Sequence, residues 1–93
     1  MPIGSVVVPS AVTIISNSAF NHCESLTSVS LPETITDIEA NAFYRCAKLA
    51  NIEFRGGKKS QLRTIGERAI CYTHLTEIAL PPNVALVDFI KIS

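Results

Sequence analysis

Residues 29–51, VSLPETITDIEANAFYRCAKLAN, repeat residues 6–28, VVVPSAVTIISNSAFNHCESLTS, and this repetition decides the fold. When the two stretches are aligned, their apolar positions coincide at an interval of 23 residues. The matched pairs are Val6/Val29, Val8/Leu31, Pro9/Pro32, Val12/Ile35, Ile15/Ile38, Ala19/Ala42, Phe20/Phe43, Cys23/Cys46 and Leu26/Leu49. A fixed period of this length is typical of a solenoid, in which each unit buries its apolar face against its neighbours.

The repeat continues towards the C-terminal end with disturbances. Residues 52–77 form a third copy of 26 residues, because four residues are gained between Phe54 and Leu62 and one is lost further on. A fourth, partial copy begins at residue 78 and becomes irregular over its last residues. We therefore predict a single domain over residues 1–93. Its repeats are expected at about 6–28, 29–51, 52–77 and 78–93.

The repeat unit resembles that of a known family. Its pattern is LxxIxLPxxIxxIxxxAFxxC, and residues 26–46, LTSVSLPETITDIEANAFYRC, form one complete copy. This motif is similar to that of the BspA-like leucine-rich repeats, and the resemblance covers residues 3–87. The chain departs from the family pattern at Ile70, where the family has Phe, and at the displaced Cys71. The resemblance implies the setting of microbial surface proteins that attach to host or matrix proteins.

Each unit is expected to contribute a strand, a short extended crossing and a turn of helix. Apolar side chains alternate at Val29 and Leu31, as in a strand with one buried face, and Pro32 ends the strand because it has no N–H to donate. The segments SNSAFNHC and EANAFYRC predict helical turns in which Phe20 and Phe43 stack. Parallel crossovers favour right-handed coiling. The expected fold is an α/β repeat solenoid of about 3.5 coils, with a parallel sheet on one face and short strands or helical turns on the other.

The outward side of the predicted sheet is a candidate partner-binding face. Small or acidic side chains form two columns there, on the surface that solenoids commonly use for binding. The candidate residues are Ser5, Ser28, Ser30, Asn51, Glu53 and Glu77. The alternative is a solvated face that only keeps the protein in solution, because the columns hold no aromatic or arginine anchor.

The third repeat contains an insertion, RGGKKSQLR (residues 55–63), that is rich in cations. Gly56 and Gly57 predict a flexible turn. The cations of this candidate basic loop are Arg55, Lys58, Lys59 and Arg63. The loop either contacts an anionic partner or is an exposed turn that tolerates charge. It lacks the arrangement of a phosphate-binding loop, and without interleaved aromatic residues it does not favour nucleic acid.

Three cysteines and two histidines allow several interpretations. Cys23 and Cys46 are repeat equivalents, and we expect both to be free, small apolar side chains in the core. The odd number of cysteines argues against a disulfide framework. His22 and His74 lie near cysteines, which leaves a zinc site or a Cys–His nucleophile pair as alternatives. Paired ligand spacings are absent, and an inward-pointing thiol lacks an activating setting. We therefore expect no enzymatic activity, no metal and no cofactor.

Charge and apolar residues are unevenly distributed along the chain. Residues 1–44 carry a net charge of −4 and residues 45–93 a net charge of +4. Neither end reads as the polar cap that a solenoid needs. The candidate self-association residues at the C-terminal end are Leu86, Val87, Phe89, Ile90 and Ile92.

The sequence favours non-catalytic protein recognition, and the resemblance extends this to a fragment of a microbial surface or adhesion protein. The alternative is a structural module that oligomerises through its uncapped ends. We expect a protein partner and not nucleic acid. No apolar run approaches the roughly 18 residues of a membrane span, and residues 1–15 lack the features of a signal peptide. The sequence therefore predicts neither membrane insertion nor export, whereas the resemblance points to the cell surface if the chain is part of a longer protein.

Overall fold

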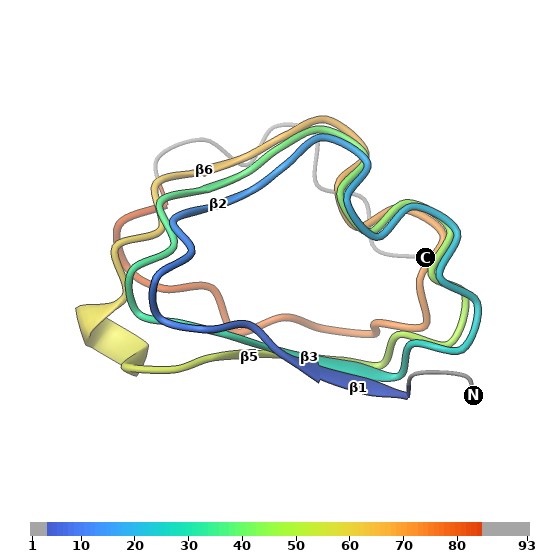
Figure 1. The fold of residues 1–93 in the computed structure, drawn as a ribbon, viewed down its shortest axis with the longest axis horizontal. Coiled ribbons are helices and arrows are strands. Elements are labelled where there is room, and N and C mark those ends of the chain that lie inside the picture. The colour runs from blue at the N-terminus through green and yellow to red at the C-terminus, as the bar shows by residue number, and fades with distance from the viewer. Residues whose placement is uncertain (1–3, 85–93) are drawn as a thin grey trace.

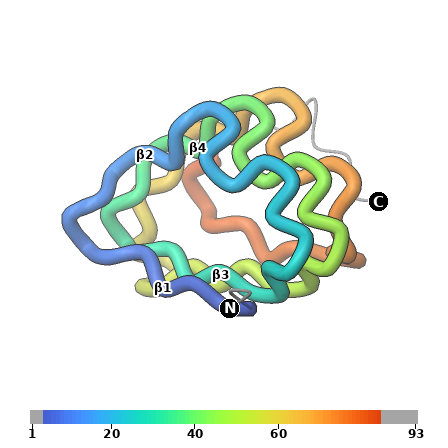
Figure 2. Tube along the Cα trace, turned by 45° about the vertical axis from the view of Figure 1, so that its right-hand side comes forward, coloured from blue at the N-terminus to red at the C-terminus, as the bar shows by residue number. Residues whose placement is uncertain are grey.

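The computed structural model describes residues 4–84, and its strands follow the repeats one by one. The strands are β1 (Ser5–Val7), β2 (Ile14–Ile15), β3 (Ser28–Leu31), β4 (Asp37–Ile38), β5 (Asn51–Phe54) and β6 (Thr64–Ile65). In Figure 1, β1, β3 and β5 lie together on one side of the coil, and β2 and β6 lie on the opposite side. Figure 2 shows the coils stacked one behind another from the N-terminal to the C-terminal end.

The strands form two parallel sheets, and their register repeats the alignment of the sequence. One sheet has the order β1-β3-β5 and the other the order β2-β4-β6. Val6 pairs with Val29, and Val29 pairs with Ile52. In the second sheet Ile38 pairs with Ile65, across the longer third repeat. Residues matched in the sequence therefore lie side by side, which confirms the predicted solenoid.

The core lies between the two sheets and consists of the repeating apolar positions. On β3, Val29 and Leu31 are buried, whereas Ser28 and Ser30 alternate with them on the outside. Full burial of a side chain such as Leu or Ile contributes about 1.5–3 kcal/mol. The rings of Phe20 and Phe43 stack with centroids 5.3 Å apart and planes 5° from parallel, which confirms the predicted aromatic ladder. The largest fully buried side chains are Phe43, Leu26, Leu31, Ile35, Ile38, Leu49, Leu62 and Ile70.

The segments expected to form helical turns form successive tight turns instead. The N–H of Ala19 donates to the C=O of Ser16 at 3.0 Å, as in one turn. However, Ser18 and His22 have left-handed backbones, with φ of 60° and 59°. A helix requires right-handed values at every residue. The N–H of His22 donates at 2.8 Å to the C=O of Tyr44 in the next coil, so hydrogen bonding between coils replaces hydrogen bonding within a helix.

The four-residue gain in the third repeat forms a bulge that contains a 3-10 helix, η1 (Gly57–Lys59). Gly56 and Gly57 have φ of 84° and 50°, a region that glycine adopts at little cost, as the sequence predicted for this turn. The chain rejoins the core at Ser60 and Leu62, where the Leu62 N–H donates to the Ser60 hydroxyl at 3.3 Å. No helix in the described residues has the length and apolar character that a bilayer crossing needs.

The fourth coil departs from the sheet. Among residues 4–84 no strand pairs with the outer edge of β5. Residues 77–80 run past it without strand pairing. Pro81 and Pro82 follow, and proline has no N–H to donate to a ladder. The expected extension of the polar columns to Glu77 is therefore not formed, although Glu77 is exposed. The predicted self-association residues Leu86, Val87, Phe89, Ile90 and Ile92 lie outside the described residues.

Candidate functional site

Two columns of outward side chains cross the sheet formed by β1, β3 and β5. In register, the columns are Ser5–Ser28–Asn51 and Val7–Ser30–Glu53. The Ser30 hydroxyl donates to the Glu53 carboxylate at 2.8 Å, which links neighbouring coils. Val7 is 68% exposed and adds an apolar edge to the face. The structure therefore brings together all the predicted sheet-face residues except Glu77.

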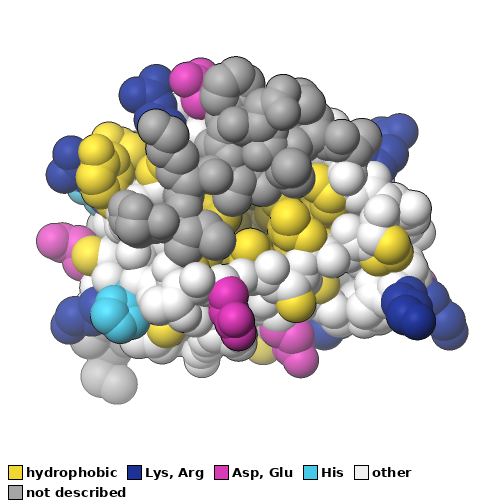
Figure 3. Space-filling model, turned by 180° about the vertical axis from the view of Figure 1, so that it is seen from behind, with side chains coloured by type: hydrophobic (Ala, Val, Ile, Leu, Met, Phe, Trp, Pro, Cys, Tyr) yellow, Lys and Arg dark blue, Asp and Glu magenta, His cyan; other side chains and the backbone are white. Residues whose placement is uncertain are grey.

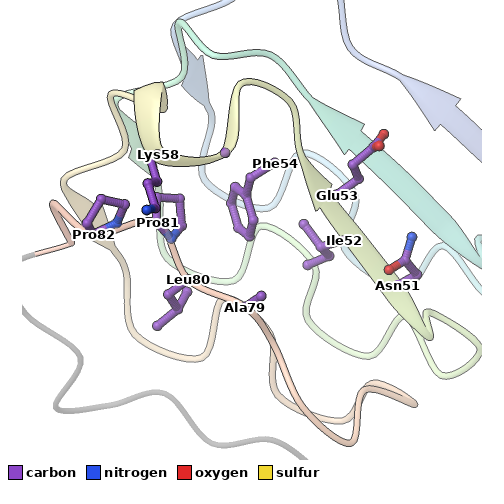
Figure 4. Close-up of a pocket in the computed structure, with 10 residues that line it drawn as sticks. Asn51, Ile52, Glu53, Phe54, Lys58, Ala79, Leu80, Pro81 and Pro82 are labelled. Carbon is purple, nitrogen blue, oxygen red and sulfur yellow. The ribbon is translucent and has the colours of Figure 1, made fainter.

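A groove lies beside β5, where the sheet ends (Figure 4). It has a volume of about 510 Å³ and separates β5 from residues 79–82. In Figure 4, Ile52 and Phe54 face Leu80 across the groove, whereas Glu53 points away from it. Because no described strand pairs with this edge of β5, the backbone groups along it remain able to bond another strand. Within the described residues, the polar sheet face and an unpaired strand edge are therefore adjacent.

The four cations of the candidate basic loop do not act together. Lys58, Lys59 and Arg63 are exposed, in and just after η1. Arg55 is half-buried and folds back across the sheet. Its Nε donates to the C=O of Leu31 at 3.4 Å, and a terminal nitrogen donates to the C=O of Val8. Arg55 therefore connects three coils, and only the other three side chains protrude.

The cysteines are free, as predicted, and differ in burial. Cys46 is buried, and its thiol donates to the C=O of Phe20 at 2.9 Å, whereas Cys23 is half-buried. Burial raises the pKa of the Cys46 thiol above its ordinary value, because the charged thiolate is poorly solvated there. Within residues 4–84, no three His, Cys, Asp or Glu side chains gather as ligands of a metal ion do.

An aromatic and cationic cluster lies on the turn side of the solenoid, where no site was predicted. We define this turn cluster as His22, Tyr44, Arg45 and Tyr72. The rings of Tyr44 and Tyr72 meet edge to face with centroids 5.6 Å apart, and the His22 ring lies 6.1 Å from that of Tyr44. The guanidinium carbon of Arg45 lies 5.4 Å from the Tyr44 centroid and 4.9 Å from the Tyr72 centroid. Tyr72 is 54% exposed, and the cluster therefore presents rings and a cation to solvent.

Sequence reasoning did not find the cluster, because it noted Cys71 only as displaced from the core position of Cys46 and assigned it no place in the turn. The N–H of Arg45 donates to the C=O of Cys71 at 3.0 Å, just as the N–H of His22 donates to the C=O of Tyr44. Cys71 is therefore the counterpart of Tyr44, and Tyr72 is the counterpart of Arg45. The signal in the sequence is the residue just before Cys23, Cys46 and Thr73. It is large and polar or aromatic in all three repeats.

The first coil leaves apolar side chains partly open at the end of the stack. Val6, Val12 and Phe20 pack against the core but are half-buried, and Ile14 is 43% exposed. Figure 3 shows the opposite end of the stack, where described hydrophobic side chains lie in the middle of the face and charged side chains lie around the margin. A partly open apolar end is a surface on which a further coil or another chain can stack.

Two solved structures are similar to this chain. The first is the leucine rich repeat protein TpLRR of T. pallidum, with 32% identity and a TM-score of 0.75 over 87% of this chain and 39% of that chain. The second is a leucine rich cell surface protein of Faecalibacterium prausnitzii A2-165, with 29% identity and a TM-score of 0.69 over 77% of this chain and 22% of that chain. The chain thus spans less than half the length of either protein. Comparison with curated protein sequences finds no significant match.

The family model described as the BspA type leucine rich repeat region matches residues 2–89, in six copies. This match covers nearly the whole chain and includes all the described coils. The chain belongs to the BspA-type leucine-rich repeat family.

Proposed function

We propose that the protein is a non-catalytic recognition module that binds a protein partner on the sheet of β1, β3 and β5. The observation that carries this proposal is the adjacency of the polar columns and the groove beside β5. The columns offer hydrogen-bonding side chains, and the groove offers apolar walls and a free strand edge. Solenoids commonly bind partners along such an extended surface.

The partner of this site presents an extended segment that lies along β5. In a parallel sheet, alternate residues direct their backbone groups to opposite neighbours. The N–H of Arg55 donates to the C=O of Leu31 in β3 at 2.9 Å, so Ile52 and Phe54 direct theirs towards the groove. An added strand gains affinity from these backbone bonds and specificity from the side chains that enter the groove.

The family match and the similar cell surface protein support a place for this module within a larger surface protein that attaches to other proteins. A repeat module of this kind contributes binding surface, and its length sets how much of a partner it covers.

The proposal is tested by capturing a partner through a photo-crosslinking residue at Glu53 and measuring the affinity of the purified pair. The double variant Asn51→Arg, Glu53→Arg is expected to weaken binding at least about tenfold, because bulky cations replace the outward polar residues of β5 beside the groove. Thr13→Arg, at an exposed position beside β2, is the matched control and is expected to change the affinity less than about twofold. Equal affinity of the double variant and the control contradicts the proposal.

A second candidate function is assembly through the ends of the stack, which the half-buried side chains of the first coil favour. The opposite net charges of residues 1–44 and 45–93 favour stacking of one chain on the next in a head-to-tail order. Light scattering over a dilution series is expected to show association that Val12→Asp removes. Loss of association at high salt indicates charge pairing, and indifference to salt indicates apolar stacking. A monomer at every concentration contradicts this function.

A further inference from the structure

The turn cluster occupies backbone positions that disfavour large side chains. His22, Arg45 and Tyr72 have left-handed φ values of 59°, 59° and 58°. Glycine adopts this region freely and asparagine with little strain, whereas a ring or a long side chain there is uncommon. The same position carries a large polar or aromatic side chain in three successive coils. Backbone positions held in such regions often serve a function, because local stability alone favours other residues.

Arg45 is held in an arrangement that suits an anion. Its guanidinium carbon lies within 5.4 Å of the centroids of the Tyr44 and Tyr72 rings, which attract the charge and restrict its movement. The N–H groups of a guanidinium point outward in its plane, so its edge can donate two parallel hydrogen bonds to one carboxylate. Because the rings already order the side chain, less conformational entropy is lost when an anion binds.

The surroundings of the cluster favour an acidic partner with an apolar neighbour. Residues 45–84 contain seven Lys and Arg and three Glu, so the part of the solenoid that carries Arg45 and Tyr72 is cationic. Arg68 is exposed at the other left-handed position of the same turn as Tyr72. The exposed Tyr72 ring offers apolar surface beside the cation, and Tyr and Arg are the residue types that dominate binding energy at protein interfaces.

We propose that the turn cluster binds a protein segment in which a Glu or Asp stands next to an apolar residue. The carboxylate accepts hydrogen bonds from the edge of Arg45, and the apolar side chain lies against Tyr72. The cluster is on the turn side of the coil and not on the sheet face, so this second docking surface does not depend on the function proposed for the sheet.

The chain itself provides a selective probe of this surface. It contains two tyrosines, both in the turn cluster, and no tryptophan, so its tyrosine fluorescence reports on this surface alone. Titration with a short capped peptide of alternating Glu and Leu is expected to change the tyrosine emission until it saturates. The affinity of this peptide is expected to fall as salt is added. The matched peptide of alternating Gln and Leu is expected to give no saturable change. Identical responses to the two peptides, or no response to the acidic peptide, overturns the proposal.

Matched variants locate the binding on the protein. Arg45→Gln is expected to weaken binding of the acidic peptide at least about tenfold, because it removes a charge-assisted pair of hydrogen bonds. Lys59→Gln removes the same charge from η1 and is expected to change the affinity less than about twofold. If Lys59→Gln weakens binding as much as Arg45→Gln does, the peptide is attracted by general charge and the proposal is wrong.

A third variant separates a binding role from a structural one. Asparagine suits the left-handed backbone at position 72 better than tyrosine does. Tyr72→Asn is therefore expected to keep the melting temperature of the wild type while losing several-fold in peptide affinity, followed through the emission of Tyr44. A variant that keeps the affinity shows that Tyr72 does not contribute to binding. A variant that melts earlier in proportion to its loss of binding assigns Tyr72 a structural role. Either result overturns the part of Tyr72 in the site.

Discussion

The first coil (residues 6–28) and the second coil (residues 29–51) share one apolar pattern but differ in burial. Val29 and Phe43 of the second coil are buried, whereas their counterparts Val6 and Phe20 are half-buried. The second coil has described neighbours on both sides, and the first has one on a single side. In a repeat protein the same residue therefore contributes different amounts of stability, because its contribution comes from the interface with the next unit.

The largest expected effect is a difference in stability between variants of the two stacked phenylalanines, Phe43 and Phe20. Phe43→Ala is expected to lower the free energy of unfolding by about 3–5 kcal/mol, because it opens a cavity that the coils on both sides cannot fill. Phe20→Ala is expected to cost about half as much, since its ring is half-buried and water can enter the space. Urea unfolding followed by circular dichroism gives both values. Equal costs contradict the comparison between the coils.

The next effect concerns two glycines at different distances from a neighbouring backbone. A Cβ at Gly66 would lie 2.4 Å from the backbone N of Ala40 in the coil before it, so Gly66→Ala must move the backbone. The expected cost is about 1–3 kcal/mol or more. A Cβ at Gly4 would meet only the Thr27 hydroxyl oxygen at 3.7 Å, an ordinary contact. Gly4→Ala is the matched control and is expected to leave the thermal midpoint nearly unchanged, and a comparable loss in both variants argues against close stacking at Gly66.

Cys23 and Cys46 occupy the same repeat position, and their reactivity with a thiol reagent compares the two coils directly. Because burial raises the pKa of Cys46, little thiolate is present there at neutral pH. A thiol reagent is expected to modify Cys23 in the folded protein at least about tenfold faster than Cys46. Mass spectrometry of digested samples taken over time measures each rate. If Cys46 reacts as fast as Cys23 in the folded protein, the Cys46 thiol is not protected by burial between coils, and the comparison is contradicted.

The smallest effect lies in the second sheet, where Asp37 takes the place that Ile14 has in the first coil. Hydrogen bonds from the hydroxyls of Thr64 and Thr36 hold the pKa of Asp37 below its ordinary value. A group with a lowered pKa in the folded state stabilises the fold above its unfolded-state pKa and loses this contribution as the pH falls through the folded-state pKa.

The stability advantage of the wild type over Asp37→Asn is therefore expected to stay constant down to about pH 5 and to shrink below about pH 4. Urea unfolding of both proteins across this range measures the difference. An advantage that grows on acidification has the wrong sign and contradicts the assignment of these hydrogen bonds.

Much of the fold could be predicted because repeat register is a property of the sequence. The pairing of Val29 with Ile52 and the stacking of Phe20 on Phe43 follow directly from aligned positions. The outward columns follow as well, since side chains alternate along a strand. The left-handed turns, such as that at Ser18, could not be predicted, because the Ser18 N–H donates to the C=O of Ala40 in another coil, a contact that the local sequence does not reveal.

The turn cluster and the groove depend on irregularities that alignment obscures. Cys71 resembles the core cysteine Cys46 in sequence, but the hydrogen bond from Arg45 shows that Cys71 is the counterpart of Tyr44. Tyr72 is therefore the counterpart of Arg45 and lies in the turn cluster. The groove arises because the fourth coil leaves β5, which two prolines favour but do not determine. The return of Arg55 across the sheet depends on three coils at once, which no local pattern encodes.

The most direct test of the difference between the coils is amide hydrogen exchange in the folded protein. The N–H of Phe20 donates to Ala42 at 2.8 Å, and that of Phe43 donates to Ala69 at 2.7 Å, so the two bonds are nearly equal in length. If neighbouring coils decide stability, Phe43 exchanges more slowly than Phe20, because it opens only when interior coils separate. Equal exchange of the two amides, or slower exchange of Phe20, would show that the first coil is as firmly held as the second.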